Sequence, residues 1–185
     1  PLFQFGWKSG LLLPLLYHDP DGSGYRYSKI LFSKKHFDKV TKLKPEPGDV
    51  FVAIFPKSGT HFSGQLVLQV MNDGEAEFDN FHDVVTGLEF ELLDPEVNPK
   101  CEGSSALGIH NFREKYQTKP ALFLTHFSTN HIPYSDDAKY IVMMRNPVDV
   151  LASLAKMMAQ GMGPRLAPGI ETCYHMMFPE DLNNW

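Results

Sequence analysis

The ten residues from Phe51 to Thr60 (FVAIFPKSGT) constrain the fold of this chain more than any other segment. Residues 50–55 are apolar on both faces, which is typical of a strand in a parallel sheet covered by helices. The strand stops at Pro56, and a short loop with Lys57 leads into a helical pattern. Strand, tight loop and helix in this order direct backbone N–H groups and the positive end of a helix dipole toward an anion. The segment therefore predicts a site for a phosphate or sulfate group.

Composition narrows the class of protein. The 185 residues are 43% hydrophobic and 21% charged, which is ordinary for a globular domain. The formal net charge of −5 does not favour nucleic-acid binding. Cys101 and Cys173 form no CxxC pair, so we expect no metal site and a reducing, cytoplasmic setting. The apolar run at 11–17 is too short to span a bilayer, and nothing in the sequence indicates an oligomeric state.

A helix is predicted over residues 61–71. Its apolar residues recur at helical spacing, and they are Phe62, Leu66, Val67 and Val70. The Asn72–Gly74 turn closes the helix. Residues 75–120 contain several prolines and glycines and predict loops and short helices, and no further helix is predicted after Gly161.

Two more short apolar strands are predicted at residues 121–125 and 139–144. His126 follows the first of them, and Arg145 follows the second. In open parallel sheets ligands bind beyond the carboxyl ends of the strands. We therefore expect Lys57, His126 and Arg145 to converge at one edge of a sheet.

The string from Arg145 to Ser153 (RNPVDVLAS) is the second informative motif. Asn146 can cap a helix whose first position is Pro147. An arginine at the end of a strand suits bidentate phosphate binding, and Ser153 lies a little over two helical turns farther along the same edge. The alternative is that Arg145 pairs with Asp149 and Ser153 is a small packing residue.

Together the motifs resemble the cytosolic-type sulfotransferase family. Residues 56–62 match its first motif, a strand followed by PKSGTTW, and residues 145–153 match RNPxDVxxS. A Thr-His pair lies between them in the family, as Thr125–His126 does here. The resemblance implies an α/β fold, a three-layer sandwich with a central parallel sheet of the P-loop NTPase-like sulfotransferase type, incomplete at the C-terminus. It divides the chain into a lead-in at 1–48 and a donor-binding part of the sulfotransferase domain at 49–185.

The resemblance also implies an activity, which is transfer of a sulfuryl group from 3′-phosphoadenosine 5′-phosphosulfate (PAPS) to a hydroxyl or amine of a small-molecule acceptor, without a metal. His126 would be the general base, a role that suits an imidazole near neutral pH. Lys57 would steady charge on the leaving phosphate. The residues that would bind the donor are Lys57, Ser58, Gly59, Thr60, His61, Phe62, Arg145 and Ser153, of which Arg145 and Ser153 would hold the 3′-phosphate.

Departures from the family pattern keep alternatives open. His61 and Phe62 replace the second threonine and the tryptophan of the first motif, and Leu124 stands where many members have a lysine. His131 is a rival base. No RKGxxG-type closing segment follows Ser153, so we expect the sequence to be part of a longer protein. The alternatives are a catalytically impaired PAPS-binding or PAP-binding module and a P-loop small-molecule kinase.

Overall fold

The computed structural model describes residues 17–18, 21–22, 27–28, 34–79, 81–89, 120–162, 167 and 169–177. The chain forms two compact units, one of residues Leu31–Met144 and one of Pro1–Ile30 with Arg145–Trp185. The loops and short helices predicted within 90–119 lie outside the described residues. Among the helices that are described, none is long and apolar enough to cross a membrane.

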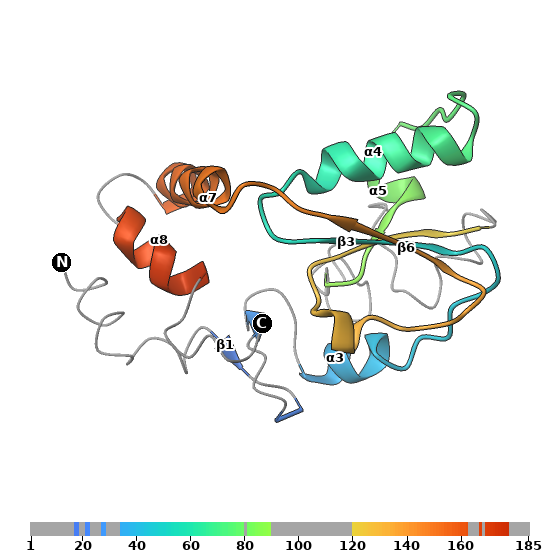
Figure 1. The fold of residues 1–185 in the computed structure, drawn as a ribbon, viewed down its shortest axis with the longest axis horizontal. Helices are drawn as coiled ribbons and strands as arrows, with labels where there is room; N and C mark the ends of the chain where they lie inside the picture. The colour runs from blue at the N-terminus through green and yellow to red at the C-terminus, as the bar shows by residue number, and fades with distance from the viewer. Residues whose placement is uncertain are drawn as a thin grey trace. The chain divides into compact units, whose positions relative to one another are not determined.

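The Leu31–Met144 unit is built on a parallel sheet with the strand order β4-β5-β3-β6 (Figure 1). The strands are β3 (Val50–Ile54), β4 (Thr86–Gly87), β5 (Leu122–Thr125) and β6 (Lys139–Met143). The strands predicted at 50–55, 121–125 and 139–144 are thus confirmed. Because the sheet is parallel throughout, the carboxyl ends of all four strands lie at one edge.

Helices cover both faces of this sheet. They are α3 (Lys34–Val40), α4 (Thr60–Met71) and α5 (Phe81–Val84), with a short 3₁₀ helix, η3, at Thr129–His131. Figure 1 shows α4 and α5 over one face and α3 on the other. The expected three-layer α/β arrangement is therefore present.

The side chains of β3 alternate between two buried faces of the sheet, which explains why its sequence is apolar on both faces. Val50, Val52 and Ile54 belong to a buried cluster on the α4 side, together with Leu122 and Leu124 of β5. The intervening Phe51 points to the opposite face, where it stacks on Phe123 at 4.7 Å and on Tyr140 at 5.3 Å between ring centroids. Phe51 on β3 is the register partner of Phe123 on β5 and of Tyr140 on β6. One strand thus supplies two separate layers of core.

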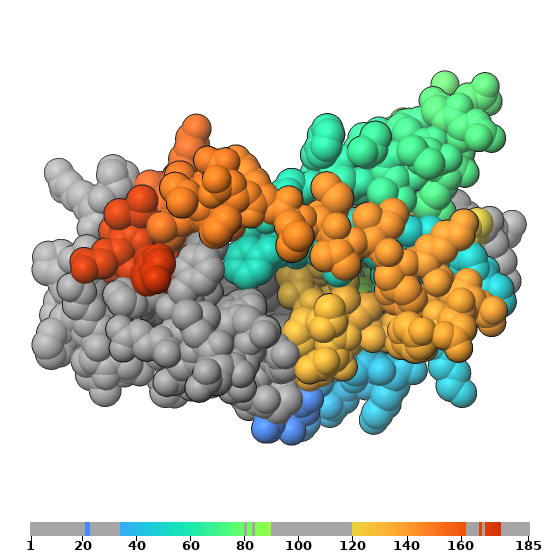
Figure 2. Space-filling view, viewed as in Figure 1, coloured from blue at the N-terminus to red at the C-terminus, as the bar shows by residue number. Residues whose placement is uncertain are grey.

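Helix α4 occupies the predicted span, but most of the apolar residues that predicted it do not face the sheet. Phe62 and Val70 are 70% and 71% exposed, and Leu66 is half exposed. Figure 2 shows α4, in green, at the surface of the molecule. The residues that lie against the sheet are Ser63, Gly64 and Leu68. Val67 and Met71 also pack against this core as partly buried side chains. The small side chains of Ser63 and Gly64 let the helix axis approach the strands closely, so residue size as well as hydrophobicity sets the packing face.

A buried aspartate connects the amino ends of three strands. Asp49 is fully buried, and its Oδ2 accepts the Glu46 N–H at 2.7 Å while its Oδ1 accepts the Ala121 N–H at 3.1 Å. Its backbone carbonyl accepts the Lys139 N–H at 2.7 Å. One residue therefore connects the starts of β3, β5 and β6. These bonds help to set the register of the three strands, and the register determines how their carboxyl ends align at the opposite edge.

The second unit contains a short antiparallel pair, β1 (Tyr17–His18) with β2 (Tyr27–Ser28), and the helices α7 (Pro147–Met162) and α8 (Ile170–Met177). The Asn146 cap is confirmed, because its Oδ1 accepts the Val148 N–H at 2.9 Å. Helix α8 lies where the helical pattern of the sequence is lost after Gly161, and it was not predicted. Helix α8 is only two turns long and is surrounded by proline and glycine, so its pattern was too short to recognise.

Candidate functional site

The loop between β3 and α4 has the backbone of an anion cradle. Lys57 has φ 67° and Gly59 has φ 104°, both in the left-handed region, and the Ser58 N–H closes a turn on the Phe55 carbonyl at 3.0 Å. Alternation of left-handed and right-handed residues turns successive N–H groups toward the same side. A side chain with a Cβ is strained at φ 104°, which explains the glycine at position 59.

The amino end of α4 lacks a side-chain cap. Gly59 is the N-cap residue and has no side chain, and its carbonyl accepts the first helical bond from the Ser63 N–H at 2.9 Å. The N–H groups of Thr60, His61 and Phe62 precede that bond, and such groups need partners from outside the helix. An anion supplies those partners and is also favoured by the helix dipole.

A buried hydroxyl supports the same interpretation. Ser58 is 8% exposed, and its Oγ is a buried polar atom with no hydrogen-bond partner. Buried polar atoms are nearly always paired in folded proteins, and exceptions are often at sites that bind a ligand or ion. The residues of this loop thus fit an anionic group such as a phosphosulfate.

His126 lies at the same edge of the sheet, immediately after β5. Its Nδ1 is 2.5 Å from the carbonyl oxygen of Ile54, the last residue of β3. A carbonyl oxygen only accepts hydrogen bonds, so Nδ1 must carry the hydrogen. In the neutral ring the other nitrogen, Nε2, then has a lone pair that can accept a proton. The structure therefore brings His126 to the strand end that begins the Lys57 loop, as the strand pattern predicted.

Glu89 is a buried carboxylate that the sequence did not single out. It is 3% exposed and lies two residues after β4, at the same edge. Its Oε1 accepts the hydroxyl of Thr125 at 2.6 Å and also the backbone N–H of His126. Strand β4 has only two residues, so no strand pattern marked Glu89 as a residue at a strand end.

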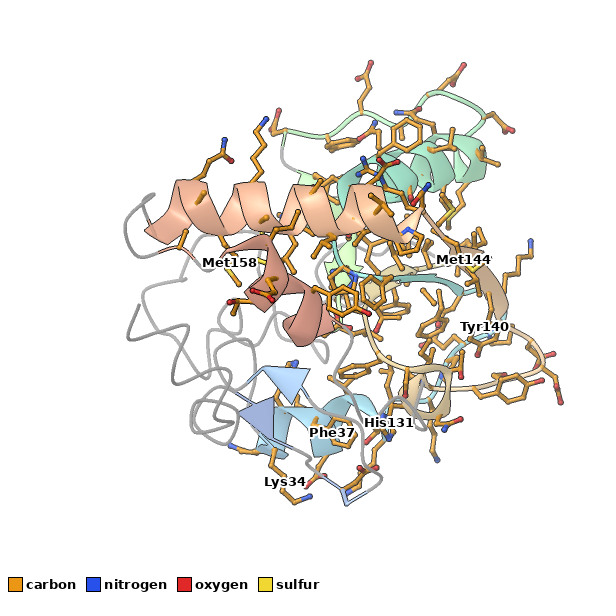
Figure 3. The ribbon with its side chains drawn as sticks, turned by 60° about the vertical axis from the view of Figure 1, so that its left-hand side comes forward. Lys34, Phe37, His131, Tyr140, Met144 and Met158 are labelled. Atoms are coloured by element: carbon orange, nitrogen blue, oxygen red, sulfur yellow. The ribbon has the colours of Figure 1, made fainter. Side chains whose placement is uncertain are left out.

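His131, the rival base, is buried and packed against an aromatic ring. It is 8% exposed, its ring meets the edge of Phe37 at 5.1 Å between centroids, and its Nδ1 lies 3.2 Å from the Ser128 hydroxyl. Figure 3 shows Phe37 and His131 beside each other. The ring is part of an aromatic cluster under α3, which Phe127 completes by packing on Phe37.

The positions that depart from the family motif have distinct environments. His61 is exposed and its ring lies 5.5 Å from both Phe81 and His82, while Phe62 points largely into solvent. Leu124 is 2% exposed within the α4-side core. Among the described residues, no group of three or more His, Cys, Asp or Glu side chains could hold a metal ion.

Arg145 and Ser153 belong to the second unit. Arg145 is exposed and lies two residues beyond the end of β6, and Ser153 is partly buried on α7. Asp149, the alternative partner considered for Arg145, is exposed in the first turn of α7.

Comparisons with known proteins agree with this architecture. The model of the family described as "Sulfotransferase domain" matches residues 47–171. Mouse sulfotransferase 1B1 is 26% identical over 130 residues, which cover 69% of this chain and 41% of that protein. Mouse sulfotransferase 1 family member D1 is 27% identical over 125 residues, which cover 64% and 38%. The chain thus spans about two fifths of the length of these relatives.

A solved structure, that of mouse sulfotransferase SULT7A1 complexed with PAP, superposes with a TM-score of 0.54 and 18% sequence identity. The match covers 87% of this chain and 50% of that one. At this identity the similarity establishes the fold. The central parallel sheet with its flanking helices is thus of the sulfotransferase type.

Proposed function

Since the chain belongs to the sulfotransferase domain family, we propose that it contains the donor-binding part of a PAPS-dependent sulfotransferase, within residues 49–185. The reaction is transfer of a sulfuryl group to a hydroxyl or amine of a small-molecule acceptor. One observation carries the proposal most directly. The His126 imidazole is held on the Ile54 carbonyl at the strand end that leads into the uncapped loop.

The loop holds the donor's 5′-phosphosulfate. In this proposal Lys57 and the hydroxyls of Ser58 and Thr60 contact the phosphosulfate at the uncapped end of α4, and the unpaired Ser58 Oγ is a ready donor. His61 and Phe62 continue the cradle with a ring N–H and an aromatic surface. Arg145 and Ser153 hold the 3′-phosphate, which distinguishes PAPS from ATP. PAP, the product of PAPS-dependent transfer, is the compound bound in the SULT7A1 structure.

PAPS supplies an activated sulfuryl group when it is bound. His126 Nε2 takes the proton of the acceptor hydroxyl or amine as the acceptor atom forms its bond to sulfur. The bond between sulfur and the bridging phosphate oxygen breaks, and its electron pair stays on the 5′-phosphate, where Lys57 balances the charge. Positioning and charge stabilisation dominate such transfers, by analogy with phosphoryl transfer.

A binding-only module remains the second candidate, and Leu124 is the observation that favours it. Many family members place a lysine there, whereas this chain buries a leucine in the core. The site therefore lacks one of the charges that transfer would use. Such a module would bind PAP without transferring sulfate.

Transfer of labelled sulfate from PAPS to a panel of phenols, alcohols and amines tests the proposal. His126→Asn is the decisive variant, because its side-chain NH₂ can still donate to the Ile54 carbonyl while no base remains. We expect PAP binding to persist and turnover to fall about 10²–10⁴-fold, the usual contribution of a general base. Unchanged turnover would remove His126 from the mechanism, and PAP binding without any transfer by the wild-type chain would favour the binding module.

A further inference from the structure

Glu89 occupies an unusual position for a carboxylate. It is 3% exposed, and within the described residues the structure records no ion pair with it. Burying an ionised carboxylate without a cation is unfavourable unless hydrogen bonds compensate. The compensation comes from two donors next to each other in sequence, the Thr125 hydroxyl and the His126 N–H. The buried Glu89 carboxylate therefore bonds both to Thr125, which precedes the proposed base, and to the backbone of His126, the proposed base itself.

The contacts of Glu89 continue through the strand end. The Thr125 hydroxyl donates to Glu89 Oε1 at 2.6 Å and accepts the Phe127 N–H at 3.0 Å. Residues 125–127 are therefore held through the Thr125 hydroxyl and through the backbone N–H groups of His126 and Phe127. The His126 ring is held separately, through Nδ1 on the Ile54 carbonyl at 2.5 Å.

These two restraints act on different parts of one residue. The Ile54 carbonyl sets the tautomer and direction of the ring, but only if the backbone places the ring within reach. Glu89 fixes that backbone from the segment that follows the neighbouring strand, β4. Reaction rates are sensitive to displacements of this kind, since a shift of about 1 Å in a catalytic group can cost roughly 10²-fold.

We propose that Glu89 is a positioning residue, which acts through the His126 backbone to keep the imidazole bonded to Ile54 and its Nε2 directed at the acceptor. The catalytic part of this inference rests on the proposed sulfotransferase function. The positioning part concerns only the state of the His126 ring. Both hydrogen bonds end on Oε1, so Glu89 acts as a hydrogen-bond acceptor and not through its charge.

Three variants of the full chain separate these possibilities. Glu89→Gln keeps an oxygen acceptor and removes the charge, and Glu89→Ala removes both. Thr125→Val removes one donor with little change in shape and serves if Glu89→Ala does not fold. The ¹⁵N chemical shifts of the His126 ring report its tautomer without any need for turnover, and calorimetric titration with PAP monitors the donor site.

We expect the wild-type and Glu89→Gln chains to hold the Nδ1–H tautomer and to turn over PAPS at similar rates. Glu89→Ala should show mixed tautomers and a kcat about 10–100-fold lower, with KM for PAPS and affinity for PAP unchanged. Thr125→Val should change both readouts in the same direction, to a smaller extent.

A folded Glu89→Ala chain with the wild-type tautomer would overturn the inference. So would a Glu89→Gln chain as impaired as Glu89→Ala, because charge would then be the active property. If no chain, wild-type included, transfers sulfate, the proposed function fails, while the ring shifts still decide whether Glu89 positions His126.

Discussion

Gly64 of α4 lies close to Leu124 of the sheet and to Phe81 of α5, and Gly64→Ala tests how that layer is packed. A Cβ at this position would lie 2.6 Å from Cζ of Phe81 and 3.0 and 3.2 Å from the two Cδ atoms of Leu124. Real Cβ atoms essentially never approach a neighbour closer than 3.0 Å. Leu124 is 2% exposed and enclosed by the core, so the strain falls on Phe81 or on the position of the helix.

Two opposing effects set the magnitude. Replacing a glycine inside a helix by alanine stabilises the helix by about 1 kcal/mol. Overpacking a core typically costs about 1–3 kcal/mol, and a contact of 2.6 Å places this site in the middle of that range or above it. We therefore expect Gly64→Ala to lower the free energy of unfolding by about 1 kcal/mol.

Urea unfolding followed by far-ultraviolet circular dichroism measures the change. A control is Gly161→Ala near the end of α7, where a Cβ meets nothing within 4 Å, and this variant should not be destabilised. The second test is the same substitution in a Phe81→Leu background, which lacks the Cζ atom. There the penalty should shrink, giving a coupling energy of about 1 kcal/mol.

A Gly64→Ala chain as stable as the wild type would contradict this description of the α4 interface. An equal penalty in the wild-type and Phe81→Leu backgrounds would show that Phe81 is not the obstacle.

Three further predictions concern individual residues. Asp49→Ala leaves two backbone N–H groups without their carboxylate. It should lower the free energy of unfolding by about 2–4 kcal/mol, at roughly 1–2 kcal/mol for each group. A loss no larger than that of a substitution at an exposed position would contradict the role given to Asp49. Asn146→Ala removes the cap on the Val148 N–H and should cost about 1 kcal/mol, with Asn146→Asp as the control that keeps the cap. Burial raises the pKa of the Cys173 thiol above its ordinary 9.0, so the native thiol should be alkylated far more slowly than the urea-unfolded one. The unfolded chain then loses this proton at lower pH than the folded chain, so stability should fall as pH rises through 9.0, and this fall should be absent in Cys173→Ala.

Much of the fold followed from local sequence patterns. The β3 strand, the loop after it and the span of α4 were predictable, because a run that is apolar on both faces and a helical period are both short-range signals. The Asn146 cap was predictable for the same reason, since its hydrogen bond reaches only two residues along the chain.

The rest depended on contacts between distant parts of the chain. The close packing of α4 depends on the small residues Ser63 and Gly64, whose importance appears only when the sheet is beneath them. Glu89 is 37 residues from His126 in sequence, and the strand before it has only two residues, so no local pattern distinguishes it from a surface glutamate. The bond between His126 and Ile54 spans 72 residues, so the tautomer could not be predicted either.

The most direct test of the central claim is calorimetric titration of the chain with PAP and with 5′-AMP, which lacks the 3′-phosphate. We expect PAP to bind about 10–100-fold more tightly, which corresponds to about 1.5–3 kcal/mol from charge-assisted bonds to the 3′-phosphate. Arg145→Ala should abolish that preference while leaving AMP binding unchanged, and Lys57→Ala should weaken both ligands. Equal affinity for PAP and AMP, or an undiminished preference in Arg145→Ala, would contradict a PAPS site built from these two motifs.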